Sequence, residues 1–174
     1  MDNTYREELV NEVKAQANAD GSTLNEAFFD IYCQRLEEAE ILEDYQYTYF
    51  EGKGANNRNV QIDGYAYSKL DERLTLFIIP PLSYFDEKTL TRTDADANFS
   101  KATHFYFDAD RVVQNAEDSS EGYGLARDIV DKRLVVHILE LIIMTYFFTS
   151  SQIWQIESPH ENDARSDYST YDIQ

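Results

Sequence analysis

Several residue types are scarce in this sequence, and each scarcity narrows what the protein can be. One cysteine among 174 residues permits no disulfide within the chain, which fits a reducing cytoplasm. Basic residues are few, because 15 Lys and Arg stand against 33 Asp and Glu, and the formal charge is −18. A field of that sign repels phosphate backbones, so we expect no direct binding of DNA or RNA by the domain alone.

Long apolar runs are also missing. The stretch from Leu134 to Phe148 is interrupted by His137 and Glu140, and it is shorter than the roughly 20 residues that span a bilayer. The first residues carry neither a basic segment nor an apolar run, so we expect no signal peptide. We therefore expect a cytoplasmic protein that makes no membrane contact.

The spacing signatures of common catalytic and metal sites are absent as well. The sequence has no Gly-rich phosphate loop, no nucleophile elbow, no His-Glu-x-x-His pair and no cysteine pair for zinc. Asp94 to Asn98 resembles the start of a calcium loop, but Phe99 and Phe105 stand where glycine and a bidentate acid are needed. We interpret the isolated histidines as packed or surface residues: His104, His137 and His160.

The composition nevertheless indicates a folded protein. Hydrophobic residues make up 43% and aromatic residues 14% of the chain, which a disordered acidic chain would lack. We predict one domain over residues 1–157. Residues 158–174 are polar, and we expect them to form a tail that begins a linker to a further C-terminal region.

Two amphipathic helices are predicted at the start. Thr4 to Ala17 carries apolar residues at helical spacing, and Thr23 with Glu26 forms a capping-box pattern that starts a second helix at Leu24. Phe29, Cys33 and Leu36 form its apolar stripe, in which we interpret Cys33 as a small buried hydrophobe. Glu40 falls on the same face as Phe29 at 100° per residue, as either a cap-like surface acid or part of a site.

The centre of the chain reads as three strands. Residues 44–50 alternate tyrosines with polar residues, and residues 58–68 alternate around Gly64 and carry one acid, Asp63. Leu74 to Ile79 is apolar without alternation, which is typical of a strand covered on both faces. Helical character follows over residues 88–115, with an extended segment considered around residues 104–107. We then predict a loop over residues 117–122, a short helix over 125–130, one or two strands over 133–148 and a last strand over 153–156.

The predicted fold class is α/β: a three-layer α/β/α domain with a central mixed sheet, in the order ααβββααβ(β). With an acid on the second strand, this order resembles that of restriction-endonuclease-like (PD-(D/E)xK) nucleases. That resemblance implies a magnesium site with Glu40 and Asp63 as its candidate catalytic acids and Asp63 as its metal ligand. The nucleases carry a second acid and a lysine on the third strand, whereas residues 74–82 contain neither, so the motif is degenerate.

The sequence also resembles the N-terminal region of bacterial abortive infection phage resistance proteins, the AIPR family. The motifs that carry the resemblance follow one another in the expected order: residues 26–29, 36–40, 60–65, 74–77, 105–107 and the segment from Leu134. The resemblance implies a part in defence against phage and a nuclease-like domain that precedes a larger C-terminal region.

Three functional hypotheses result. The first is a non-catalytic, nuclease-like binding or regulatory module without a cofactor, which contacts a protein partner or the C-terminal region of the same protein through an acidic, tyrosine-rich surface. The second is an active Mg²⁺-dependent nuclease, in which Asp71 or Glu72 supplies a missing ligand. The third is an acidic DNA mimic that blocks a nucleic-acid-binding enzyme. Under the first hypothesis Asp63 is structural and holds the turn at Gly64.

Overall fold

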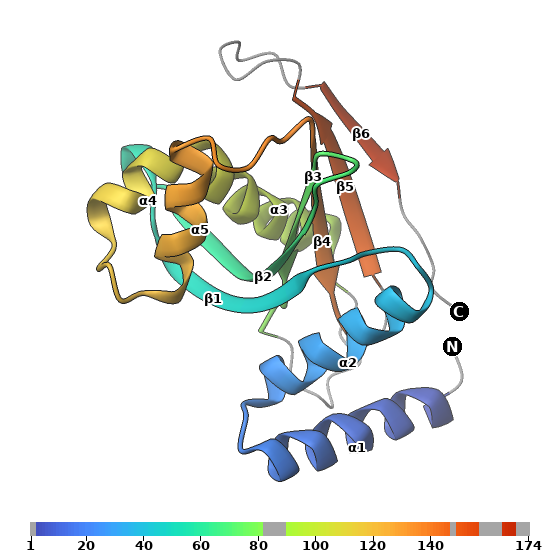
Figure 1. Ribbon diagram of the computed structural model, residues 1–174. Coiled ribbons are helices and arrows are strands. Elements are labelled where there is room, and N and C mark those ends of the chain that lie inside the picture. Colours follow the sequence, from blue (N-terminus) through green and yellow to red (C-terminus); the bar gives the residue numbers. More distant parts are fainter. Residues whose placement is uncertain (1–2, 82–89, 147–148, 157–164, 170–174) are drawn as a thin grey trace.

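The computed structural model describes residues 3–81, 90–146, 149–156 and 165–169. Figure 1 shows its helices and strands. They are, in order, α1 (Asn3–Asp20), α2 (Leu24–Glu38), β1 (Tyr45–Lys53), the 3-10 turn η1 (Ala55–Asn57), β2 (Asn59–Ser68), β3 (Arg73–Ile78), α3 (Arg92–Phe107), α4 (Ala109–Asn115), α5 (Glu121–Val130), β4 (Ile138–Met144), β5 (Thr149–Gln155) and β6 (Arg165–Ser169).

The strands form one mixed sheet in the order β1-β2-β3-β4-β5-β6. Neighbouring strands are antiparallel except β3 and β4, which run parallel with Leu74 opposite Leu139. A parallel pair needs a crossover connection, and α3, α4 and α5 lie in it. The predicted α/β class with a central mixed sheet is confirmed.

Helices cover the sheet on two sides and enclose two separate cores, which makes the three predicted layers (Figure 1). On one side α1 and α2 pack on Phe77, Ile79 and Met144. On the other, α3, α4 and α5 pack on a second set of sheet residues that includes Leu76 and Leu141. β3 is therefore buried on both faces, as its unbroken apolar run predicts.

The two N-terminal helices form as the sequence predicts. Thr23 caps α2, and its hydroxyl accepts a hydrogen bond of 3.1 Å from the amide of Glu26. The stripe of α2 is buried, with Phe29 and Cys33 both 0% exposed. Burial raises the pKa of the Cys33 thiol well above its usual range, so this cysteine is the small buried hydrophobe that was expected.

The central helical region differs from the prediction in detail. Residues 104–107 are the last turn of α3, so the extended segment considered there is wrong. The reason is that the buried apolar residues recur at helical spacing: Ala102, Phe105, Ala109 and Val112. The ring of Phe105 packs against that of Phe50, with the ring centres 5.7 Å apart. Asp108 ends α3 and separates it from α4. The last helix, α5, begins at Glu121, inside the predicted loop.

The strand predicted over residues 133–148 is shorter in the structure. β4 begins only at Ile138. Three residues earlier, the backbone of Val135 bonds to a side chain and not to a strand: the hydroxyl of Tyr67 donates to the carbonyl of Val135 and accepts from its amide. Residues 147 and 148 lie outside the described residues. β5 contains most of the predicted last strand but begins at Thr149.

The sheet continues into the segment expected as a polar tail. β6 pairs antiparallel with β5, with Ser169 opposite Ser151 and Arg165 opposite Gln155. Its sequence is polar and has no apolar alternation, so in composition it resembles a linker, and sequence patterns do not indicate a strand there. The edge of the sheet therefore does not coincide with the predicted boundary at residue 157.

Candidate functional site

The candidate acid Asp63 lies in the interior of β2. Its side chain is 0% exposed. One carboxylate oxygen, Oδ2, accepts a hydrogen bond of 2.8 Å from the amide of Ile79 and a longer one of 3.4 Å from the side chain of Gln61. The other oxygen, Oδ1, is buried without a hydrogen-bond partner among the described residues.

β1 and β2 bend beside Asp63, and this bend explains why the Asp63 side chain bonds to the backbone amide of Ile79. The described pairing of β2 with β3 ends at Gly64 opposite Phe77, and Thr48 and Tyr49 of β1 form an irregularity opposite Asp63. Such a bulge bends a hairpin and interrupts its ladder. The carboxylate of Asp63 therefore accepts the amide hydrogen of Ile79, just beyond the last residue of β3.

Gly64 allows the bend to pack against α2. A Cβ atom at residue 64 would lie 2.3 Å from Cε2 of Phe29 and 2.9 Å from the carbonyl oxygen of Gln46. Both distances are too short for any side chain, so the ring of Phe29 occupies the space that glycine leaves free. The bend beside Asp63 is held by packing as well as by hydrogen bonds.

The electrostatics of Asp63 follow from its burial. Removal from water raises the pKa of the carboxyl group from its ordinary value of 3.8 to about 6. The hydrogen bonds from Ile79 and Gln61 and the charge of Lys101 act in the opposite direction but do not cancel this effect. Asp63 therefore gains or loses its proton at a pH just under neutral.

A lysine on the facing helix connects to this acid through a glutamine. The ammonium group of Lys101, on α3, donates a hydrogen bond of 3.1 Å to Oε1 of Gln61, and the amide nitrogen of Gln61 donates to Asp63. Sequence reasoning missed both partners. Gln61 lies only two residues before Asp63, but no local pattern brings Lys101 to β2 from 40 residues away.

The other candidate acids lie elsewhere. α2 ends at Glu38, and Glu40 follows the helix in a left-handed backbone conformation with its side chain exposed. The expectation that Glu40 shares the face of Phe29 assumed a helix two residues longer and is wrong. Glu40 is thus a surface acid beside the helix C-terminus.

Asp71 and Glu72 belong to the turn between β2 and β3. The hydroxyl of Ser68 donates a hydrogen bond to the carboxylate of Asp71, and the carboxylate of Glu72 contacts Nδ1 of His137. Asp63 precedes Ser68 by five residues of extended strand, or roughly 16 Å at about 3.3 Å per residue. Neither acid is brought toward Asp63.

A magnesium ion does not fit the described residues around Asp63. The ion needs near-octahedral oxygen coordination, usually with at least one or two carboxylates that keep several waters. Among the residues that the structure describes, no three His, Cys, Asp or Glu side chains are grouped to hold a metal ion. The acid that is present accepts a backbone amide instead.

The architecture and its buried acid define the class of the protein: a three-layer α/β/α domain with a bent central hairpin. Residues 28–174 match the profile of the family described as abortive infection phage resistance protein N-terminal domain. The match covers most of the chain, so the chain belongs to this family, as its motifs indicated. Membership implies a role in abortive infection, which is a defence against phage.

The remaining comparisons add no relatives. No curated protein sequence and no solved structure matches the chain. Across the described residues, no helix is both long enough and apolar enough to cross a membrane.

Proposed function

We propose that this domain is a non-catalytic binding or regulatory module of a phage-defence protein, acting in the cytoplasm. The fold is a nuclease-like α/β/α sandwich in this proposal, and the acid of its second strand has become structural. The observation that carries the proposal is the hydrogen bond between Oδ2 of Asp63 and the amide of Ile79. That oxygen stabilises the bend of the hairpin and is not available to a metal ion.

The surface supports an interaction with another protein. The formal charge of −18 favours a basic partner and disfavours nucleic acid. Tyr5 and Tyr49 are 46% and 41% exposed, and tyrosine is enriched at contact surfaces because it combines an apolar ring with a hydroxyl. Tyr45 and Tyr47 pack against Phe29 instead, so only part of the tyrosine-rich strand β1 is free for a partner. The partner is a separate protein or a C-terminal region of the same protein.

An active nuclease is the second candidate, and one observation favours it. Buried acids with raised pKa values are common at catalytic sites, and Oδ1 of Asp63 is buried without a partner among the described residues. A metal ion or a water molecule would satisfy that oxygen. The residues that would complete the coordination are not grouped around it in the described structure.

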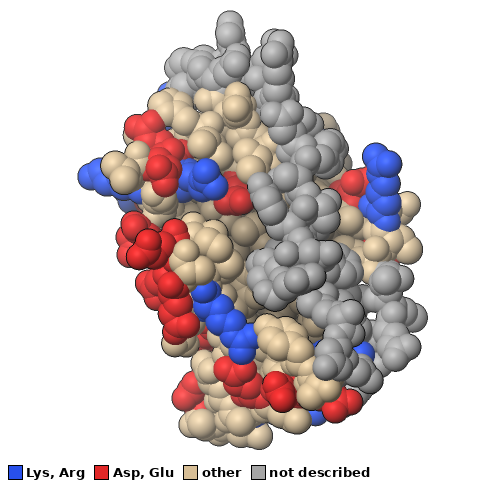
Figure 2. All heavy atoms as spheres, turned by 90° about the vertical axis from the view of Figure 1, so that its right-hand side faces the viewer, with Lys and Arg blue, Asp and Glu red and all other residues tan. Residues whose placement is uncertain are grey.

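A DNA mimic has less support. Figure 2 shows Lys and Arg side chains between the groups of Asp and Glu on the face that it presents. Mimicry of a nucleic-acid backbone needs an uninterrupted series of negative charges, like the phosphates themselves. The mixed charges on this face favour contacts with a protein surface.

Metal binding and DNA cleavage test the proposal together. We expect no heat of binding when Mn²⁺ or Mg²⁺ is titrated into the protein, and no metal-dependent cleavage of single- or double-stranded DNA. The variants are Asp63→Asn and, as a matched control, Asp110→Asn, which alters an exposed acid of α4 outside the candidate site. Cleavage that Asp63→Asn abolishes and Asp110→Asn preserves would contradict the proposal and establish the nuclease.

A further inference from the structure

The large apolar side chains that remain exposed are concentrated at one end of the domain. Four of the seven in the described residues lie at the end of the sheet where β2 ends and β4 begins: Leu70, Phe107, Val130 and Val135. Leu70, in the turn between β2 and β3, is 92% exposed, and Val135, just before β4, is 50% exposed. Exposed apolar groups that gather in one place are typical of a contact surface.

Two segments far apart in the sequence form this surface. They are the β2/β3 turn, residues 67–73, and the connection from the end of α5 to β4, residues 127–137, at the upper end of the sheet in Figure 1. The hydroxyl of Tyr67 bonds to the backbone of Val135, and the carbonyl of Glu72 accepts the amide of His137 at 2.8 Å. We call the joint surface of these two segments the turn face.

The turn face is nearly neutral in a strongly acidic chain. Its two segments contain five Lys and Arg against four Asp and Glu, whereas the rest of the chain contains ten against 29. Several of its charges are paired within the face, because Arg133 contacts both Asp128 and Asp131, and Arg127 contacts Asp131. A second copy of this acidic chain would therefore meet much less repulsion here than over the rest of the surface.

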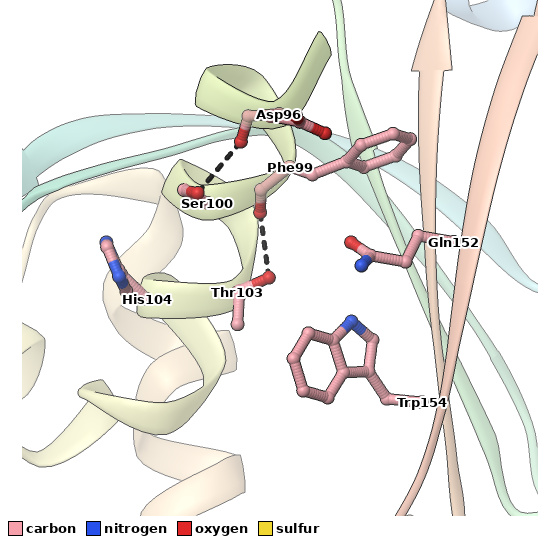
Figure 3. A pocket seen from close by; sticks show the side chains of 7 residues that line it. All are labelled: Asp96, Phe99, Ser100, Thr103, His104, Gln152 and Trp154. Carbon is pink, nitrogen blue, oxygen red and sulfur yellow. Dashed lines mark hydrogen bonds between the residues drawn. The ribbon is translucent and has the colours of Figure 1, made fainter. Parts of the chain in front are cut away.

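Phe107 extends the apolar surface from the turn face toward β5. Its ring packs edge-on against Trp154, with the ring centres 6.0 Å apart. Trp154 also borders a hollow of about 290 Å³ between α3 and β5, and Figure 3 shows Gln152 facing the helix across it. The exposed side chains that α3 contributes to this hollow, such as Asp96 and Ser100, are polar. The apolar surface therefore does not continue into the hollow.

The β2/β3 turn has an order of charges that suits contact with itself. Lys69 and Asp71 flank Leu70, and all three are exposed. The hydroxyl of Ser68 donates to the carboxylate of Asp71 at 3.2 Å, which holds this acid within the turn. In a two-fold symmetric contact the same patch meets itself, so every pairing occurs twice. With Leu70 near the axis, Lys69 of each copy meets Asp71 of the other.

We propose that the turn face binds a second copy of this chain and forms a symmetric dimer. Leu70 of each copy lies at the two-fold axis, Val130 and Val135 are covered beside it, and Lys69 and Asp71 form ion pairs between the copies. A basic partner is attracted to the acidic remainder of the surface, so the dimer leaves that surface free. The proposal does not depend on the role of Asp63, whose described hydrogen bonds lie outside the turn face.

Sedimentation equilibrium of the whole chain tests the dimer. We expect a reversible monomer–dimer equilibrium with a dissociation constant on the order of 100 µM, because an interface built on few apolar side chains is small. Dimerisation should strengthen when NaCl rises from about 0.05 to about 0.5 M, since salt screens the repulsion between two acidic chains. A protein that remains a monomer in both salts, well above that concentration, would overturn the proposal.

Two variants that each add one acid at an exposed apolar position locate the contact. Leu70→Asp alters the turn face, whereas Ile41→Asp alters a residue that follows α2 and is 65% exposed. We expect Leu70→Asp to weaken dimerisation about tenfold or more, as loss of a central apolar contact does, and Ile41→Asp to dimerise like the wild type. Circular dichroism checks that both are folded. An unchanged dimer in Leu70→Asp, or equal losses in both variants, would overturn the proposal.

Charge reversals test the two-fold pairing. Lys69→Asp leaves only acids beside Leu70, and Asp71→Lys leaves only lysines. Each variant alone should dimerise about threefold more weakly, because exposed ion pairs contribute little and like charges then face each other. Mixed in equal amounts, the two variants are complementary and should form a heterodimer at least as stable as the wild-type dimer. A mixture that associates no better than the separate variants would overturn the proposed pairing.

Discussion

Two polar groups of this domain, the carboxyl of Asp63 and the indole of Trp154, both lack a complete set of hydrogen bonds but lie in opposite surroundings. Asp63 is 0% exposed beside a bend that Gly64 and Phe29 fill tightly. Trp154 borders a hollow of about 290 Å³. The comparison teaches that incomplete hydrogen bonding means different things in the two places. At Asp63 it raises the pKa of an ionisable group, whereas the indole of Trp154 does not ionise and its unpaired N–H only lowers stability.

The largest expected effect tests how tightly the surroundings of Asp63 are packed. Gly64→Ala places a Cβ atom 2.3 Å from Phe29 and 2.9 Å from the backbone of β1. Because the backbone of the bulge cannot move freely, we expect a loss of about 3 kcal/mol in the free energy of unfolding. Urea denaturation measures it.

Gly124→Ala is the matched control for this substitution. Gly124 lies inside α5, and a Cβ atom there meets nothing within 4 Å. The variant should gain roughly 0.5–1 kcal/mol, because alanine favours the helix. Equal and small effects at residues 64 and 124 would show that the backbone at the bend can move to accept a Cβ atom. The statement that the surroundings of Asp63 are tightly packed would then be wrong.

The second-largest effect is a change in the free energy of unfolding with pH, of up to roughly 3 kcal/mol, which arises from Asp63. The pKa of Asp63 is about 6 in the folded protein against an ordinary value of 3.8. The folded state therefore binds the proton more tightly than the unfolded state, and stability falls as pH rises from about 4 through 6. The difference between the two pKa values corresponds to roughly 3 kcal/mol.

Asp63→Asn removes this dependence, since the amide stays neutral and its oxygen can still accept from Ile79. We expect the variant to become more stable relative to the wild type as pH rises from 4 to 7, and the difference to be constant above about 7. Urea denaturation of both proteins at each pH gives the difference directly. A difference that does not change with pH would mean that Asp63 ionises in the folded protein as readily as in water.

The smallest change in the free energy of unfolding is expected at Trp154, which borders the hollow between α3 and β5. Trp154→Phe removes the indole N–H and keeps an aromatic ring against Phe107. Because the nitrogen has no partner among the described residues, its loss should change the free energy of unfolding by less than about 1 kcal/mol. Thermal denaturation monitored by circular dichroism checks this. A loss of 2 kcal/mol or more would show that the indole contributes to the fold and would remove the contrast with Asp63.

Much of the architecture could be predicted from local patterns. Thr23 and Glu26 predicted the start of α2, and the apolar run from Leu74 predicted a strand buried on both faces. These predictions succeed because capping and periodicity act over a few residues of one element. β6 could not be predicted in the same way, because its polar sequence becomes a strand only when β5 offers it a partner.

The same distinction between local patterns and contacts of distant segments applies to the candidate site residues. The sequence by itself determined the family, the acidic charge and the position of Asp63 on the second strand, which is the first arm of the β2/β3 hairpin. Only the tertiary structure decided that Glu40 is a surface acid, that Lys101 reaches Gln61, and that Gln152 faces α3 across a hollow. The physical reason is that such contacts depend on where the bulge bends β2 and where the crossover helices lie on the sheet. The bend of β2 and the positions of these helices are determined by packing between elements far apart in the chain.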